Sequence, residues 1–318
     1  MDLALNHRAA ALADAMEAEA RELRVAVRRL GGGARVIDCG VQVEGSWEAG
    51  RRLAEICLAG LATVSLTTID AEGLWLPGVQ VATDHPVAAC LASQYAGWRI
   101  DPEGYVAMGS GPARAVAGVE RELYERIGYA ESSPQGVLVL ESRVLPGEAV
   151  ASFVAARCRI AAEGLNLLVA PTASLAGSAQ IAARALETGL HKMLTLGFDV
   201  NKVRTGLGLC PMAPIAKDDL QGLGWTNDCV LDGARAYFVV QAADHEVEAM
   251  LDRLPASASP DYGTPFSDIF QRVHQDFYKI DPLLFSPAEV TINNQATGRV
   301  FRAGRVDAKM LRTTLGRG

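Results

Sequence analysis

The chain has 318 residues, of which 49% are hydrophobic and 21% are charged, a composition that fits one large globular domain or two medium ones. Its net charge of −7 argues against a nucleic-acid partner, because proteins that bind nucleic acids usually present a basic surface. No stretch reaches the roughly 20 apolar residues of a membrane span, and residues 1–16 lack the basic start and apolar run of a signal peptide. We therefore expect a cytoplasmic protein with no nucleic-acid partner and no membrane partner.

The six cysteines and five histidines are scattered along the chain. No two cysteines form a CxxC pair, and no HxH or HxxxH spacing occurs. Zinc sites and redox motifs use such closely spaced residues. We therefore expect buried apolar thiols in a reducing compartment, and no metal held by protein side chains.

The first half of the chain predicts hairpins and helices. Two stretches of alternating apolar and polar residues flank the three glycines at 31–33 and predict a β-hairpin. The sequence Asp-His-Pro at 84–86 predicts a helix that ends near Gly97, since Asp caps helices, Pro suits the first turn and Gly ends them. The other predicted elements are strands at residues 61–69 and 78–83 and a helix at residues 112–127.

The second half predicts parallel strands covered by helices. Residues 137–140 and 165–170 are continuous apolar runs with a predicted helix between them, and another helix follows. This order of strands and helices is typical of parallel α/β structure. Further hairpins are predicted at residues 229–240 and 288–302.

These elements predict a mixed α/β and α+β fold class with two α/β domains. The polar, turn-rich residues 131–136 form the best candidate for a domain junction. The predicted domains are therefore residues 1–132 and residues 133–318. Whether the hairpin at 288–302 packs back on the first domain stays open.

The strongest candidate for catalysis lies on the helix predicted after the second apolar strand. Four polar residues on it are Gln180, Arg184, Glu187 and His191. Their spacing of 4, 3 and 4 residues places them in one narrow stripe, unless Gly189 ends the helix before His191. The rest of this helix is small or apolar, so a charged pair on it must be mutually satisfied or face a cavity. Arg184 and Glu187 therefore form either a structural ion pair or a catalytic one.

A second candidate is a substrate-binding loop that contains Gly109, Ser110, Gly111 and Arg114. Glycines let the backbone approach a ligand, and a helix that starts at Pro112 would aim free N–H groups at an anion. The same residues also fit a tight turn before a proline-started helix. Both alternatives stay open.

Asn227 and Asp228, which precede a predicted strand, form a third candidate. Their side chains suit paired hydrogen bonds to an amino-pyrimidinone edge, and they equally suit an ordinary turn. Phe266, Phe277 and Tyr278 farther along either line a pocket or belong to the core.

Eight short segments, spread over nearly the whole chain, carry a family resemblance. They are Val36-Ile-Asp-Cys-Gly-Val41, Ala59-Gly-Leu-Ala-Thr-Val64, Thr83-Asp-His-Pro86, Ala107-Met-Gly-Ser-Gly-Pro-Ala-Arg114, Val169-Ala-Pro-Thr-Ala-Ser174, Ala183-Arg-Ala-Leu-Glu-Thr-Gly189, Thr226-Asn-Asp-Cys229 and Asp276-Phe-Tyr-Lys-Ile-Asp-Pro282. Any one of them alone would be weak. All eight in this order resemble the methenyltetrahydromethanopterin cyclohydrolase family.

The resemblance implies two α/β domains with a substrate pocket between them, assembled as a homotrimer. It implies reversible hydrolysis of 5,10-methenyltetrahydromethanopterin to the 5-formyl derivative in one-carbon metabolism, with the pterin as substrate and with no metal or redox cofactor. By the motif match, the family's essential glutamate falls on Glu187 and its companion arginine on Arg184.

Two other functions stay open at this point. The chain could be a non-catalytic subunit that binds a pterin or another anion, or a folate-type methenyl cyclohydrolase. The presence of both Arg184 and Glu187 argues against the binding subunit, since a relative without chemistry could lose the pair freely.

Overall fold

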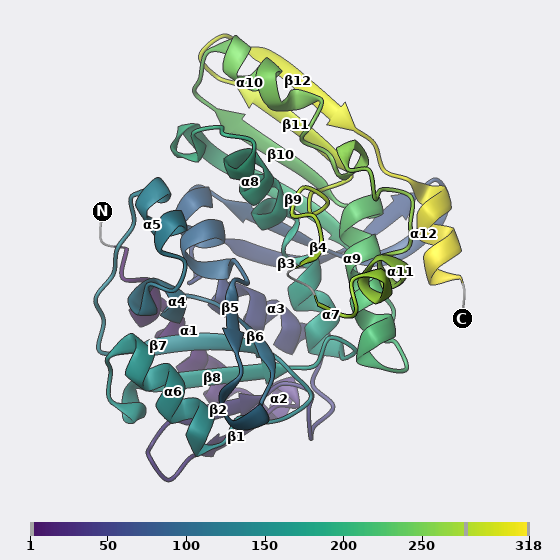
Figure 1. Ribbon diagram of the computed structural model, residues 1–318. Coiled ribbons are helices and arrows are strands. Elements are labelled where there is room, and N and C mark those ends of the chain that lie inside the picture. Colours follow the sequence, from purple (N-terminus) through teal and green to yellow (C-terminus); the bar gives the residue numbers. More distant parts are fainter. Residues whose placement is uncertain (1–2, 277–278, 317–318) are drawn as a thin grey trace. The chain divides into compact units, whose positions relative to one another are not determined.

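The computed structural model describes residues 3–276 and 279–316 (Figure 1). These residues form two compact units, each built around a six-stranded mixed sheet. Unit 1 holds the chain up to Thr63 together with Ala88–Gln180, and unit 2 holds Val64–Val87 together with the chain from Ile181 onward. The chain therefore passes from one unit to the other at three points. The predicted class, two α/β domains, is confirmed.

The sheet of unit 1 has its parallel strands at the centre. Its strands are β1 (Ala26–Arg29), β2 (Arg35–Asp38), β5 (Trp98–Ile100), β6 (Ala107–Ser110), β7 (Gly136–Glu141) and β8 (Leu165–Ala170). Its helical elements are α1 (Leu5–Ala18), α2 (Ala20–Leu23), α3 (Trp47–Cys57), η1 (Val87–Gln94), η2 (Pro102–Gly104), α4 (Ala113–Ala117), α5 (Arg121–Ile127), α6 (Glu148–Cys158), η3 (Ala162–Gly164) and most of α7 (Leu175–Ala182). In the order β1-β2-β8-β7-β6-β5, β8 is parallel to β2 and β7, and the outer pairs are antiparallel.

The central strands of unit 1 are buried on both faces. On β7, Val137 and Val139 join the core that contains α1 and α3, whereas Leu138 and Leu140 join the core that contains α6. Figure 1 shows α6 in front of these strands. A strand covered on both faces needs apolar side chains at every position, which is why residues 137–140 and 165–170 are continuous apolar runs.

The sheet of unit 2 is mostly antiparallel. Its strands are β3 (Thr63–Ala71), β4 (Leu74–Thr83), β9 (Val203–Pro211), β10 (Arg235–Val240), β11 (Glu289–Asn294) and β12 (Arg299–Gly304). Its helical elements are α8 (Ala185–Thr195), η4 (Val200–Lys202), α9 (Asp219–Gly233), α10 (Asp244–Leu251), η5 (Ala256–Ala258), α11 (Phe266–Arg272) and α12 (Ala308–Leu315). The order is β12-β11-β10-β9-β4-β3, with β10 parallel to β11.

Helices cover one face of the sheet in unit 2 and leave the other open. On β10, Ala236, Phe238 and Val240 are buried, while the alternating Arg235 and Tyr237 are exposed. Because successive side chains of a strand point to opposite faces, this alternation indicates one covered and one uncovered face. The helices α8 and α9 both pack against β9.

The hairpins predicted at each end of the chain are confirmed. β1 pairs with β2, and β11 pairs with β12, both antiparallel. The C-terminal hairpin extends the sheet of unit 2, because β11 also pairs with β10.

The two units differ from the predicted division at residues 132 and 133. That division would separate β6 from β7, yet these strands are hydrogen-bonded neighbours in the sheet of unit 1. It would also separate β4 from β9, which pair in unit 2. The polar stretch at 131–136 is a loop within unit 1, so its composition marks a surface turn and no boundary.

Three predicted segments have a different structure. Residues 229–232, predicted as a strand, lie in α9, because a short apolar run fits a buried helix as well as a strand. The helix predicted at 84–97 is a π-helix, η1, and the one at 112–127 is divided into α4 and α5 at Gly118. Within the described ranges, none of the helices has the length and hydropathy that a membrane crossing requires.

Candidate active site

The predicted catalytic residues lie where one helix ends and the next begins. The helix α7 ends at Ala182 and α8 starts at Ala185, so the predicted single helix is wrong. Arg184 directly precedes α8, with φ −91° and ψ 2°. Glu187 lies in the first turn of α8 and is buried.

Arg184 and Glu187 form an ion pair in which the guanidinium Nη1 lies 3.7 Å from the carboxylate Oε2. The two side chains are 11% and 7% exposed, so both charges are largely withdrawn from water. Free backbone N–H groups at the start of α8 carry partial positive charge and attract the carboxylate. The result is a carboxylate held in place beside a guanidinium, an arrangement that suits a base.

The break between α7 and α8 changes the predicted stripe of four polar residues. Gln180 belongs to unit 1, whereas Arg184 and Glu187 belong to unit 2. The helix α8 continues past Gly189 to Thr195, so His191 lies one turn after Glu187 on the same helix. The structure therefore groups Arg184, Glu187 and His191 on one element and leaves Gln180 on another.

A glycine in β9 allows the first turn of α8 to lie close against the sheet. A Cβ atom on Gly208 would lie only 3.0 Å from Leu186 Cγ and 3.2 Å from the Leu186 backbone N. Any larger residue would push the helix outward. Leu186 is fully buried in this contact and directly precedes Glu187. The sheet thus fixes the position of the candidate base.

Lys192 is a buried residue on α8 that the sequence analysis missed. Its side chain donates a hydrogen bond to the carbonyl oxygen of Leu283 and is almost fully enclosed. Burial lowers the pKa of Lys192 from 10.5 to about 8, although Asp281 opposes this shift. The available signal in the sequence was the position of Lys192 between the apolar residues Leu190 and Met193, both of which are buried.

Arg114 supports the end of a buried helix. It has no exposed surface, and its guanidinium donates hydrogen bonds to the carbonyl oxygens of Ser93 at 3.1 Å and Leu91 at 3.4 Å. These carbonyls belong to the C-terminal end of η1, where the helix dipole attracts a cation. Glu120 completes the arrangement with an ion pair to Arg114 at 2.9 Å.

The rest of the loop at 109–114 serves the same helix end. Gly111 has φ +102° and donates its N–H to the carbonyl oxygen of Ser93 at 2.9 Å. The buried Ser110 hydroxyl lies 3.3 Å from the thiol of Cys57. Protein groups surround the Arg114 guanidinium on every side, so the geometry favours the tight-turn interpretation over the anion-binding one.

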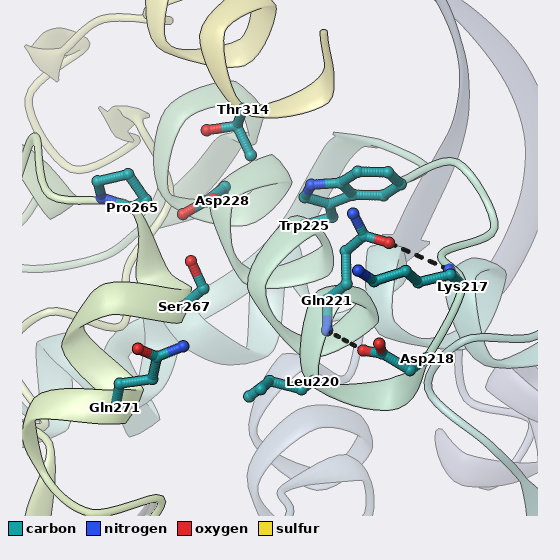
Figure 2. Close-up of a pocket in the computed structure, with 10 residues that line it drawn as sticks. All are labelled: Lys217, Asp218, Leu220, Gln221, Trp225, Asp228, Pro265, Ser267, Gln271 and Thr314. Atoms are coloured by element: carbon teal, nitrogen blue, oxygen red, sulfur yellow. Dashed lines mark hydrogen bonds between the residues drawn. The ribbon is translucent and has the colours of Figure 1, made fainter. Parts of the chain in front are cut away.

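Asn227 and Asp228 lie in the second half of α9. The Asn227 amide donates to the carbonyl oxygen of Leu223 in the same helix at 2.8 Å. Asp228 is 3% exposed, and its Oδ1 accepts the backbone N–H of Phe266 at 2.9 Å. Asp228 also lines a cavity of about 270 Å³ between α9, α11 and α12 (Figure 2).

The aromatic residues named as possible pocket residues have different positions. Phe266 is fully buried in a hydrophobic cluster with Leu231, Ile269 and Leu284. Phe277 and Tyr278 lie outside the described residues.

Asp232, one turn after Asp228, is a second buried acid that the sequence analysis missed. It is 3% exposed. Burial raises the pKa of Asp232 from 3.8 to about 7, and repulsion from Asp228 and Asp307 acts in the same direction. A hydrogen bond with Tyr262 partly opposes this shift. Two acids four residues apart in an otherwise apolar stretch were the signal in the sequence.

The cysteines behave as predicted, because all six are buried thiols and none is in a disulfide. Burial raises the pKa of the Cys158 thiol from 9.0 to about 12, so this thiol stays protonated at neutral pH. In the part of the chain that the structure describes, no three His, Cys, Asp or Glu side chains are grouped so that they could hold a metal ion.

Comparison with known proteins gives one family over nearly the full length. The family model described as Cyclohydrolase (MCH) matches residues 4–315. The chain is 46% identical to the methenyltetrahydromethanopterin cyclohydrolase of Methanocaldococcus jannaschii, over 99% of this chain and 98% of that protein. It is 42% identical to the one from Methanococcoides burtonii, with the same coverage, and 43% identical to the one from Methanothermobacter thermautotrophicus, over 99% of both chains.

Proposed function

Because the chain belongs to the cyclohydrolase (MCH) family, we propose that it catalyses the reversible hydrolysis of 5,10-methenyltetrahydromethanopterin to 5-formyltetrahydromethanopterin in one-carbon metabolism. The structural observation that carries this proposal is the buried Arg184–Glu187 pair at the start of α8. The Glu187 carboxylate of this pair can act as a base, and its negative charge complements a cationic substrate.

The substrate defines what the site must supply. Its methenyl carbon is an amidinium carbon, shared between two nitrogens, and is therefore positively charged and electrophilic. Water attacks this carbon and loses a proton as the C–O bond forms. The bond to the aryl nitrogen then breaks, that nitrogen takes up a proton, and the hydroxyl group on the carbon loses its proton as the C=O bond forms. The formyl group stays on the other nitrogen. The net reaction consumes one water and releases one proton.

Glu187 can perform two of these proton transfers, and the hydroxyl proton is the one released. Its carboxylate takes the proton from the attacking water and, once protonated, can donate it to the departing nitrogen. Its negative charge also attracts the amidinium. Arg184 orients the carboxylate through their ion pair, which limits the geometries from which water can be activated.

We propose that no metal and no redox cofactor takes part. The amidinium carbon is already electrophilic, so a Lewis acid has little to add, and hydrolysis transfers no electrons. Exhaustive chelation should leave turnover unchanged. Loss of turnover that zinc restores would contradict this mechanism.

For the remaining predicted substrate-binding residues we propose two different roles. Asn227 and Asp228 stay candidates for direct contact, since Asp228 faces a cavity. Gly109, Ser110, Gly111 and Arg114 contribute indirectly, because the loop that they form holds the C-terminal end of η1.

We propose that the protein assembles as a homotrimer. The support is the family resemblance together with the uncovered face of the sheet in unit 2. Leu207 and Tyr237 are cross-strand neighbours on this face and are 43% and 38% exposed. Apolar residues exposed together often mark a surface that binds a partner. Light scattering should give about three times the chain mass of 33.7 kDa, and a stable monomer at micromolar concentration would contradict the proposal.

We propose a cytoplasmic location as well. The support is the set of six buried thiols outside any disulfide, which is typical of proteins that stay in a reducing compartment. Fractionation of the source cells should place the protein in the cytoplasm, and its recovery outside the cytoplasmic fraction would count against this.

One assay separates the proposed function from its alternatives. The absorbance of the methenyl pterin falls as its amidinium is hydrolysed, so purified protein should accelerate this decay and leave methenyltetrahydrofolate nearly unchanged. A preference for the folate would indicate the folate-type enzyme. Binding of the pterin without acceleration would indicate a non-catalytic subunit.

A further inference from the structure

Lys192 is a buried cation that the proposed mechanism does not use. It lies in α8, five residues after Glu187, and is only 1% exposed. An ammonium has three N–H donors, yet among the described residues this one makes a single hydrogen bond, to the carbonyl oxygen of Leu283. Burial of a charge costs free energy that one hydrogen bond offsets only in part. An apolar side chain would cost less at this position, so the lysine indicates a role other than stability.

The carbonyl that Lys192 binds belongs to a turn between α11 and β11. The Asp281 carboxylate accepts the N–H of Leu283 at 2.9 Å, and the Asp281 carbonyl oxygen accepts the N–H of Leu284 at 2.9 Å. A few residues later, the buried Ser286 hydroxyl donates to a carbonyl oxygen in the segment after α10 at 2.5 Å. The turn is therefore ordered by its own hydrogen bonds and has two attachments, one to α8 and one to the residues after α10.

Contacts along its whole length hold α8 in place. The start of the helix lies over Gly208 of β9. Farther along, a Cβ atom on Gly189 would lie 3.0 Å from Phe238 Cζ and 3.5 Å from Pro287 Cδ, so the helix also fits closely against β10 and against the chain just after the turn. Lys192 adds a contact with the turn itself. The position of α8 thus depends on this turn as well as on the sheet.

The Lys192 contact acts on the helix that carries the candidate base. Five residues correspond to about 7.5 Å along a helix axis. Backbone hydrogen bonds link successive turns of a helix, so a shift at Lys192 moves Glu187 as well. A misplacement of about 1 Å can cost about 100-fold in rate. A loosened contact at Lys192 would therefore affect the rate of the reaction without touching the substrate.

The strength of this contact depends on the charge of Lys192. Burial lowers the pKa of Lys192 from 10.5 to about 8. Two other charged groups face it: Asp281, on the turn, opposes the shift, and Arg253, after α10, adds to it. A hydrogen bond from a charged donor is roughly twice as strong as one from a neutral donor. The attachment of the turn to α8 should therefore weaken as pH rises through about 8.

Global stability should change in the opposite direction. The pKa of Lys192 is lower in the folded protein than in the unfolded chain, so between pH 8 and pH 10.5 the unfolded chain binds more protons at this residue. The free energy of unfolding should therefore rise with pH over this range, even though the local contact weakens. A residue retained for stability alone would not show this opposition.

We propose that Lys192 is a positioning residue, which in its charged form fastens the turn at 281–284 to α8 and thereby holds Glu187 where it activates water. The inference rests on the proposed function for the role of Glu187. It adds to the site a residue that belongs neither to the Arg184–Glu187 pair nor to the predicted substrate-binding residues.

The Lys192→Met variant tests the proposal, because Met is similar in length and has neither the charge nor the donors. We expect kcat to fall about 10-fold with little change in KM. The thermal midpoint should stay within a few degrees of the wild-type value, because removal of the buried charge offsets the lost hydrogen bond. Lys202→Met is the matched control, since Lys202 is partly exposed and pairs with Glu246, and its kcat should stay normal. A clearly less stable Lys192→Met with normal turnover per folded molecule would make Lys192 a structural residue and overturn the proposal.

The pH profile separates positioning from packing. The kcat of the wild type should fall as pH rises through about 8, because the neutral amine holds the turn less firmly. Lys192→Arg keeps its charge throughout this range, since a guanidinium stays protonated, so its kcat should not show this fall. Lys192→Met should have a low kcat without the fall. An alkaline fall that persists unchanged in the variants would come from another group and would contradict the proposal. Should Lys192→Met not fold, Lys192→Arg decides.

Hydrogen exchange tests the contact without the reaction. At pH 7, the amides of Leu283 and Leu284 should exchange about 10-fold faster in Lys192→Met than in the wild type, while amides in α9 should not change. Equal exchange in the folded variant would overturn the proposal. If the wild type does not hydrolyse the methenyl pterin, the proposed function fails, and exchange still decides whether Lys192 fastens the turn. If the wild type is active and folded Lys192→Met keeps the normal kcat, the positioning role is wrong and the function stands.

Discussion

Replacing Glu187 by Gln tests the proposed mechanism most directly. The amide has nearly the same shape as the carboxylate, so the first turn of α8 should keep its contacts, but it can neither take a proton from water nor attract the amidinium. Loss of a positioned base typically costs about 100- to 10,000-fold in rate. We expect kcat to fall by at least this factor, measured as the decay of methenyl-pterin absorbance per folded molecule.

The same substitution should also reduce stability by a definite amount. Two charges 3.7 Å apart attract by about 4 kcal/mol at an effective dielectric constant near 20, and desolvation offsets part of this. Removal of one partner of a buried pair typically costs about 3–5 kcal/mol. Because Arg184 is 11% exposed and Gln keeps an acceptor oxygen, we expect the lower end, about 3 kcal/mol. At about 2–4 °C per kcal/mol, the thermal midpoint should fall by roughly 6–12 °C.

A matched variant separates loss of catalysis from loss of an ion pair. Glu120→Gln breaks the pair of Glu120 with Arg114, whose side chains are 17% and 0% exposed and which has no role in the chemistry. It should lower the thermal midpoint to a similar extent and leave turnover per folded molecule near the wild-type value. If folded Glu187→Gln turned over within a few-fold of the wild type, as Glu120→Gln should, Glu187 would not be the base.

Three further predictions follow from other parts of the structure. Arg114→Met should lower the free energy of unfolding by about 3–5 kcal/mol in a denaturant titration and raise KM only slightly, since its contribution to binding is indirect; a strongly raised KM with normal stability would restore the anion-binding interpretation. Because the pKa of Asp232 is raised, the folded protein binds more protons at this residue than the unfolded protein does. The free energy of unfolding therefore falls as pH rises from about 4 to about 7. Asp232→Asn should therefore gain up to about 4 kcal/mol relative to the wild type between pH 4 and pH 8, and a pH-independent difference would refute the assigned shift. Gly208→Ala forces Leu186 outward and should lower kcat roughly 10-fold, whereas Gly147→Ala, which meets no atom within 4 Å, should not; equal activities would show that the first turn of α8 tolerates the shift.

The parts of the structure that the sequence predicts well depend on short-range patterns. Arg184 and Glu187 meet because i, i+3 neighbours meet at the start of any helix, and the break at Ala183 does not alter this. The parallel strands of unit 1 are recognisable because residues buried on both faces must all be apolar. Glycine turns identify the terminal hairpins for an equally local reason.

The parts that the sequence does not predict depend on distant partners. From the sequence, Arg114 is a candidate for binding an anion. Only the fold shows that its guanidinium donates to the carbonyl oxygens of Ser93 and Leu91. That the buried hydroxyl of Thr314 has no hydrogen-bond partner among the described residues becomes visible only when α12 packs near α9. The junction predicted near residue 132 differs from the observed units for the same reason, because long-range strand pairing defines the units and local composition does not.

The three crossings of the chain between the units determine the order in which the protein can fold during synthesis. The hairpin of β3 and β4 leaves the ribosome early, but the strand that pairs with β4, β9, begins only at Val203. Until then one edge of β4 has no partner, and unpaired strand edges promote aggregation. Unit 1, whose last strand ends at Ala170, can complete its sheet first, with the β3–β4 segment extruded as a loop. Nascent chains that stop between Gln180 and Val203 should therefore contain a protease-resistant unit 1 and a protease-sensitive segment at 64–87.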